Sequence, residues 1–163
     1  MMTPTDLIAS AYSMAAQLLH RMVDDLSPDE FTRQPCSGAN SATWVVGHLT
    51  ATLRNSLRRL GATDLPELPA GLAGKFVATK HVAGEQTGLG DPKEMLKLFD
   101  LFVDRLTALI RGLPAERLTT VPEVRGPFAT NFGEALQFGA LHIAMHTGQL
   151  STIRRSLGKP PIV

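Results

Sequence analysis

Two histidines near the C-terminal end of the chain have the spacing of a metal site. His142 and His146 are four residues apart in a segment with helical periodicity, so their side chains share one face, one turn apart. That face, which also carries Phe138, Gly139 and Gln149, is expected to be buried. A buried polar group without a partner costs about 1–3 kcal/mol. Coordination of a metal, or hydrogen bonds to a neighbouring helix, would offset this cost, and the pair alone leaves both alternatives open.

A third histidine favours the metal. His48 lies at the edge of the apolar stripe of an earlier helix, with Trp44 one turn before it, Thr52 one turn after it and Asn55 further along the same face. Such a row of aromatic and polar side chains suits the lining of a cleft better than a packed core. The predicted site is therefore a metal centre of His48, His142 and His146, with Trp44, Thr52, Asn55 and Gln149 as pocket or hydrogen-bonding residues.

Three neutral histidines leave at least one coordination position open, which is typical of a catalytic metal. The metal could lower the pKa of a bound water to about 7, or hold a thiol as its thiolate. No other catalytic residue is predicted. Cys36, the only cysteine, follows Pro35 in a loop and is expected to be a spectator, so a reacting thiol would be external. Glu134 is expected to cap its helix, and Arg59 at a helix end is expected to be solvated rather than to attract a carboxylate.

Four segments with helical periodicity must position these side chains. We expect helices up to about residue 26, over about 41–60, from Asp91 to Gly112, and over about 131–157. No strand-like alternation of useful length is present, so the sequence predicts an all-α four-helix bundle with a long crossover between its second and third helices. In the first helix the expected buried stripe is Leu7, Ala11, Met14, Leu18, Met22 and Leu26.

Composition restricts the functions further. A chain of 163 residues is expected to form a single domain, residues 1–163. Its net charge of +1 offers no field for nucleic acid or an anionic membrane, and no apolar run is long enough to span a bilayer. A single cysteine and no visible signal peptide favour the cytoplasm. His20 is expected on the surface, and His81 lies in the glycine-rich crossover with no ligand spacing.

Two motifs in order resemble the DinB-like superfamily. The first is Trp44-Val45-Val46-Gly47-His48-Leu49, and the second runs from Leu141 through His142, His146 and Gln149 to Leu150, followed by Ile153-Arg154-Arg155 and Leu157-Gly158-Lys159-Pro160. Together with the four helices and the crossover, the resemblance spans essentially the whole chain. It implies a DinB/YfiT-like bundle with an up-down-down-up arrangement, commonly homodimeric, in which the histidines matching His48, His142 and His146 bind a metal, usually zinc or nickel.

The resemblance also implies three functions. The first is a metal-dependent transferase that joins a low-molecular-weight thiol, as co-substrate, to a small electrophile. The second is a YfiT-like metal-dependent hydrolase, and the third is a non-catalytic metal-binding stress-response module. In the two enzymatic cases the expected partner is a small-molecule substrate.

Overall fold

The computed structural model describes residues 1–163 except 71, 73, 77–85, 87, 123–127 and 163. The described part is all-helical, without a strand. Its elements in chain order are α1 Pro4–Val23, the short α2 Pro28–Thr32, α3 Ala42–Arg59, α4 Pro92–Arg111, the 3₁₀ turn η2 Ala115–Thr119 and α5 Phe132–Ser156. The predicted four-helix bundle is therefore confirmed, with the crossover between α3 and α4. None of the described helices is long and apolar enough to cross a membrane.

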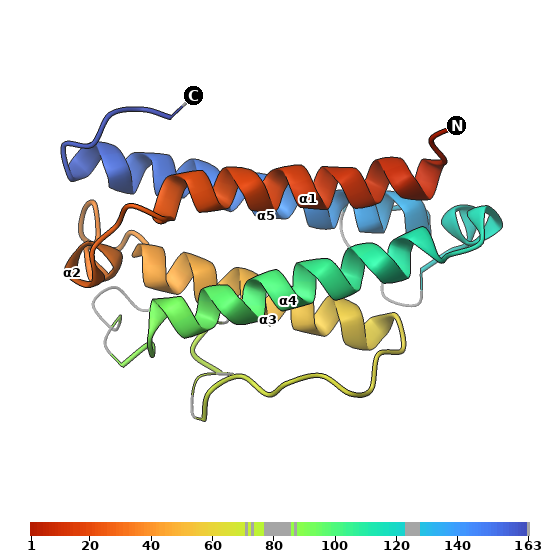
Figure 1. Cartoon of the computed structure of the whole chain (residues 1–163), viewed down its shortest axis with the longest axis horizontal. Coiled ribbons are helices and arrows are strands. Elements are labelled where there is room, and N and C mark those ends of the chain that lie inside the picture. The colour runs from red at the N-terminus through yellow and green to blue at the C-terminus, as the bar shows by residue number, and fades with distance from the viewer. Residues whose placement is uncertain (71, 73, 77–85, 87, 123–127, 163) are drawn as a thin grey trace.

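The four long helices run up, down, down and up (Figure 1). α1 and α5 are parallel, since the Tyr12 hydroxyl donates to the Leu136 carbonyl at one end and Arg154 donates to the Met22 carbonyl at the other. α3 and α4 are also parallel, and both run against α1 and α5 (Figure 1). Two parallel neighbours cannot be joined by a tight turn, so the chain needs the long segment that follows α3 to return to the start of α4.

The helix starts are fixed by side chains that cap free backbone amides. Ser41 accepts from Trp44 N at the start of α3, and Asn131 accepts from Glu134 N at the start of α5. Glu134 in turn accepts from Thr130 N at 2.7 Å, which agrees with the capping role expected for it. Asp91 caps α4 by accepting from Lys93 N. Each cap sets where its helix begins, and hence the register of the side chains that follow.

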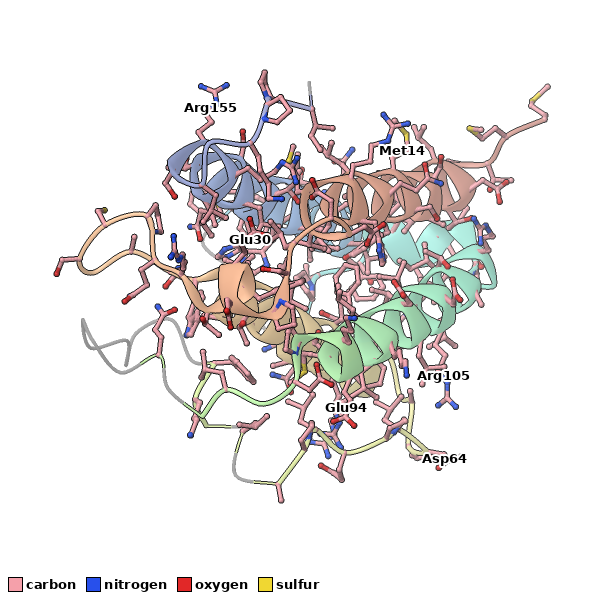
Figure 2. The ribbon with its side chains drawn as sticks, turned by 60° about the vertical axis from the view of Figure 1, so that its left-hand side comes forward. Met14, Glu30, Asp64, Glu94, Arg105 and Arg155 are labelled. Atoms are coloured by element: carbon pink, nitrogen blue, oxygen red, sulfur yellow. The ribbon has the colours of Figure 1, made fainter. Side chains whose placement is uncertain are left out.

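The buried face of α1 differs from the predicted one. Leu7 and Met14 were expected in the core, but their exposed fractions are 58% and 66%, and Met14 points away from the bundle (Figure 2). The helix instead buries Ile8, Ala9, Tyr12, Ala15, Ala16, Leu19, Met22 and Val23. α1 carries two apolar stripes, and packing against both α4 and α5 selects the one that faces both neighbours. The unselected stripe lies beside exposed Leu141 of α5. Whether it forms the expected homodimer stays a prediction.

Two arginines, one on α3 and one on α4, form hydrogen bonds to the first part of the crossover. Arg54 of α3 is buried, donates through Nε to the Pro66 carbonyl at 2.7 Å and forms an ion pair with Glu67. Arg105 of α4 donates to the Asp64 carbonyl, and the two residues lie side by side in Figure 2. Further along the crossover, Leu72, Phe76 and Leu89 are buried in the core. His81 lies outside the described residues.

His20 links α1 to α4 and is not the free surface residue expected from periodicity. Its Nε2 lies 2.7 Å from an Asp100 carboxylate oxygen and its Nδ1 2.9 Å from one of Asp24. Burial lowers the pKa of His20, but the hydrogen bonds to Asp100 and Asp24 outweigh it, so that the net pKa is raised above its ordinary value. The protonated ring can donate to both carboxylates at once, which the neutral ring cannot.

This bridge predicts a pH-dependent contribution to stability. Because the pKa of His20 is higher in the folded chain than the unfolded value of about 6.5, the contribution is complete below that pH and is lost as the pH rises through the folded pKa. We expect His20→Gln to lower the free energy of unfolding by about 1 kcal/mol near pH 6 and by much less near pH 9. Urea unfolding at both pH values measures the difference, and an equal loss at both would contradict the bridge.

Candidate metal centre

Three histidines meet where α3 and α5 face each other. His48 comes from the middle of α3, and His142 and His146 come from successive turns of α5. Their ligand nitrogens all lie within 4.8 Å of one another. The Nε2 atom of His142 is 3.3 Å from that of His48 and 3.1 Å from that of His146. Two nitrogens bound to one tetrahedral zinc ion at about 2.0–2.1 Å would be about 3.3–3.4 Å apart, so the cluster has the size of a metal site.

Hydrogen bonds on the far side of two rings decide which nitrogens carry protons. His48 Nδ1 lies 2.8 Å from the Phe76 carbonyl oxygen, which can only accept, so this nitrogen is the donor. His146 Nδ1 lies 3.3 Å from Gln149 Oε1, which also accepts from Asn40 Nδ2 at 3.2 Å. The Nε2 atoms of His48 and His146 are then both unprotonated and directed at the same point.

This arrangement leaves an unbalanced cluster of lone pairs. A proton on His142 Nε2 can be donated to His48 or to His146, but not to both. One short nitrogen–nitrogen contact would therefore have no hydrogen between its atoms, whereas a cation at the centre would be bound by all three lone pairs. The donor set fits a divalent transition metal such as zinc or nickel, and these hydrogen bonds give His48 and His146 the orientation that such ligands have.

The surroundings of the cluster keep the two α5 rings, His142 and His146, neutral. His48 and His146 are buried and His142 is partly buried. Burial lowers the pKa of His142 to about 4, with the neighbouring rings of His146 and His48 acting in the same direction. Burial also lowers the pKa of His146, and the neighbouring His48 ring acts in the same direction. The hydrogen bond to Gln149 opposes this shift only in part. At neutral pH His142 and His146 are therefore uncharged, the form that binds a metal.

Of the predicted pocket residues, Trp44 and Gln149 contact the cluster. The indole ring of Trp44 stacks on His48 with centroids 4.8 Å apart and planes 6° from parallel. Gln149, although exposed, orients His146. Thr52 donates its hydroxyl to the His48 carbonyl within its own helix, and Asn55 is exposed without a recorded contact to the three rings. The wall of the cluster is thus aromatic more than polar.

Two contributors to the site, Phe76 and Asn40, were not predicted from the sequence. The Phe76 carbonyl belongs to the crossover, and its ring lies on Gly47, where an added Cβ would be 2.1 Å from a ring carbon. The glycine preceding His48 was the only signal for such a close neighbour. Asn40 precedes the cap of α3, and its amide reaches Gln149 across the seam between α3 and α5. No residue spacing could have indicated either contact.

The face of α5 that was predicted to be buried is buried only in part. The buried residues of α5 are Leu136, Ala140, Ile143, His146, Thr147, Leu150, Ile153 and Arg154. His146 is therefore buried as predicted, whereas His142 and Phe138 are partly buried and Gln149 is exposed. α5 packs mainly on α1, and its contact with α3 is much slighter. The face that carries the histidines therefore lies at the edge of the core, where a ligand from solvent can reach it.

Comparison with known proteins supports this reading of the fold. The sequence model of the DinB superfamily matches residues 11–150. The solved structure of YfiT from Bacillus subtilis has a TM-score of 0.70 with this chain at 18% identity, covering 96% of this chain and 89% of that one. That protein is described as "a probable metal-dependent hydrolase with an unusual four-helix bundle topology". No curated protein sequence matches the chain.

The packing of Phe76 on Gly47 gives a test of how His48 is held. We expect Gly47→Ala to displace the Phe76 ring and with it the carbonyl that accepts from His48 Nδ1. The loss should be about tenfold in zinc affinity and about 1–3 kcal/mol in stability. Competition with a chromogenic chelator measures the first, and urea unfolding the second.

Gly148 provides the matched control. It lies in α5 next to the cluster, but an added Cβ meets nothing within 4 Å. Gly148→Ala should leave zinc affinity unchanged and raise stability by up to about 1 kcal/mol, because alanine favours the helix. If both variants weaken zinc binding equally, the contact between Gly47 and Phe76 does not support His48.

Proposed function

Because the chain belongs to the DinB superfamily, we propose that it is a divalent-metal-dependent enzyme acting on a small molecule, and that its reaction is a hydrolysis. The metal would be held by His48, His142 and His146, and when bound it would supply a Lewis acid that activates the nucleophile. The observation that carries the proposal is the convergence of three Nε2 atoms, two of them stripped of protons by hydrogen bonds at the opposite ring nitrogen.

Other groups of the chain orient two of the three histidines, while one side of the site stays open to solvent. The Phe76 carbonyl and Gln149 fix the tautomers of His48 and His146. The Nε2 atoms of both rings are then unprotonated, so no proton would have to leave them when a metal binds. Trp44 covers one face of His48 and keeps water from it. The slight contact between α3 and α5 leaves access from the remaining side. Three neutral ligands also leave the full charge of the metal available to polarise a substrate.

Hydrolysis comes ahead of thiol transfer because of the structural neighbour, which is described as a probable metal-dependent hydrolase. The sequence analysis had placed thiol transfer first. One observation still favours transfer as the second candidate: no carboxylate among the described residues contacts the three rings, so the described part of the site offers no acidic general base. A thiol deprotonated by the metal itself would need none.

Metal content is the first test. We expect purified protein to contain about one zinc or nickel ion per chain by elemental analysis. His146→Ala should lower the affinity for zinc by at least about 100-fold, because it removes one of three ligands. His20→Gln, on a different pair of helices, is the control and should retain the metal. Absence of metal from both native and reconstituted protein would exclude the proposed function.

The reaction type is the second test. Zinc- and nickel-loaded protein is incubated with p-nitrophenyl esters and with a generic electrophile, each with and without glutathione, bacillithiol or mycothiol. We expect ester hydrolysis that needs no thiol and is abolished in His146→Ala. Turnover that requires a thiol would favour the transferase, and a metal-loaded protein inactive on every substrate would favour the non-catalytic module.

A further inference from the structure

A cavity lies between α3 and α5, beyond the histidines along the two helices. It has a volume of about 280 Å³, and its walls include Ser56 and Arg59 of α3 and Ala135 and Gly139 of α5. Ser56 lies eight residues after His48, and Ala135 lies seven residues before His142. At 1.5 Å per residue both displacements are about 10–12 Å, and they point the same way because the two helices are antiparallel. The near walls of the cavity, Ser56 and Ala135, therefore lie about 10–12 Å from the histidines along the helix axes. Arg59, three residues further along α3, begins about 16 Å away, and helical side chains incline toward the N-terminus of their helix, which here is the direction of the histidines.

The cavity offers hydrogen-bond donors of one kind. The Tyr12 hydroxyl at its floor donates to the Leu136 carbonyl, and the hydroxyls of Ser56 and Thr120 donate to backbone carbonyls. The remaining side-chain donors among its described walls are the guanidinium groups of Arg59 and Arg117. Both arginines are exposed at the rim. A ligand that enters the cavity thus meets cationic donors, and its partner group must accept from them.

Neither guanidinium is neutralised by the described part of the chain. Among the described residues, no carboxylate forms an ion pair with Arg59 or Arg117, although Arg58, the neighbour of Arg59, contacts Glu67 at 3.5 Å. Arg117 is positioned instead by an aromatic ring, with its Cζ 5.4 Å from the centroid of Phe132. The described walls of the cavity contain no acidic residue. Planar guanidinium groups of this kind bind carboxylates and phosphates through paired hydrogen bonds.

We propose that this cavity binds the anionic end of the substrate, a carboxylate or similar oxyanion separated by about 10 Å from the atom that reacts at the histidines. Apolar walls from Ala135, Leu136 and Gly139, which lie nearer the histidines than Arg59 does, would hold the carbon chain between the two groups. The volume is close to the lower limit of small-molecule pockets, about 300 Å³, which suits one end of a substrate rather than all of it. The part of this proposal that concerns the reacting end of the substrate rests on the proposed function, whereas anion binding in the cavity does not.

Binding to metal-free protein tests the anion site without any metal. Octanoate and its uncharged analogue octanamide are titrated into the protein and followed by NMR at low salt. We expect octanoate to bind at least about tenfold more tightly than octanamide, and Arg59→Gln/Arg117→Gln to remove this preference. Arg58→Gln is the matched control and should change the affinity less than about twofold. Equal octanoate affinity in the double variant and in the wild type would overturn the proposal.

A probe with two carboxylates tests the reach along the groove. Suberate has the same number of carbons as octanoate, with a carboxylate at each end. In zinc-loaded protein we expect suberate to bind at least about tenfold more tightly than octanoate, and this gain should vanish in Arg59→Gln/Arg117→Gln. If suberate gains nothing, the cavity and the histidines do not share one substrate, and the proposal fails. If the chain does not bind zinc, the proposed function is wrong. Octanoate binding to the metal-free protein would still depend on the two arginines, so the two failures can be distinguished.

Discussion

The hydrogen bond between His48 Nδ1 and the Phe76 carbonyl is the interaction on which the metal centre depends. It fixes the tautomer of His48, and it does so with a backbone atom from the crossover rather than from a helix. The Phe76 ring in turn lies against Gly47, and any larger residue at position 47 would occupy the space of that ring. The position of one loop residue therefore determines which ring nitrogen of a histidine on α3 donates and which is left to bind a metal.

The rest of the bundle keeps α5 at the correct height for its two histidines. Tyr12 reaches the Leu136 carbonyl because Gly139 leaves room for its hydroxyl, and an added Cβ at residue 139 would lie 1.9 Å from that oxygen. At the other end of the helix, buried Arg154 pairs with Asp25 and donates to the Met22 carbonyl. These contacts hold α5 on α1. The side of α5 that faces α3 is therefore not needed for packing against α1 and can carry residues that bind ligands.

Much of this arrangement could be predicted from the sequence, for reasons that differ between residues. The spacing of His142 and His146 is a local property of one helix, and the caps at Ser41, Asp91 and Asn131 are local as well. The meeting of His48 with the other two rings required the bundle to be assumed, and four amphipathic segments without strand-like alternation supported that assumption before any family resemblance was considered.

What could not be predicted depends on contacts between distant segments. The buried face of α1 was misassigned because two apolar stripes run along this helix, and only the positions of α4 and α5 decide which of them is covered. His20 was expected to be solvated because its partner Asp100 is eighty residues away. The Phe76 carbonyl was invisible because every residue has one. Periodicity identifies a face, but the partner of that face is a property of the fold.

The crossover has a consequence for how the chain reaches its working state. A bundle with two parallel neighbours needs a long return segment, and here that segment also carries the acceptor for His48. Any ligand that binds more tightly when the acceptor is in place must, by mass action, favour the docked arrangement of the segment over the detached one. Attachment of the return segment and affinity at the histidines are thus thermodynamically linked, and a change that loosens one weakens the other in equal measure.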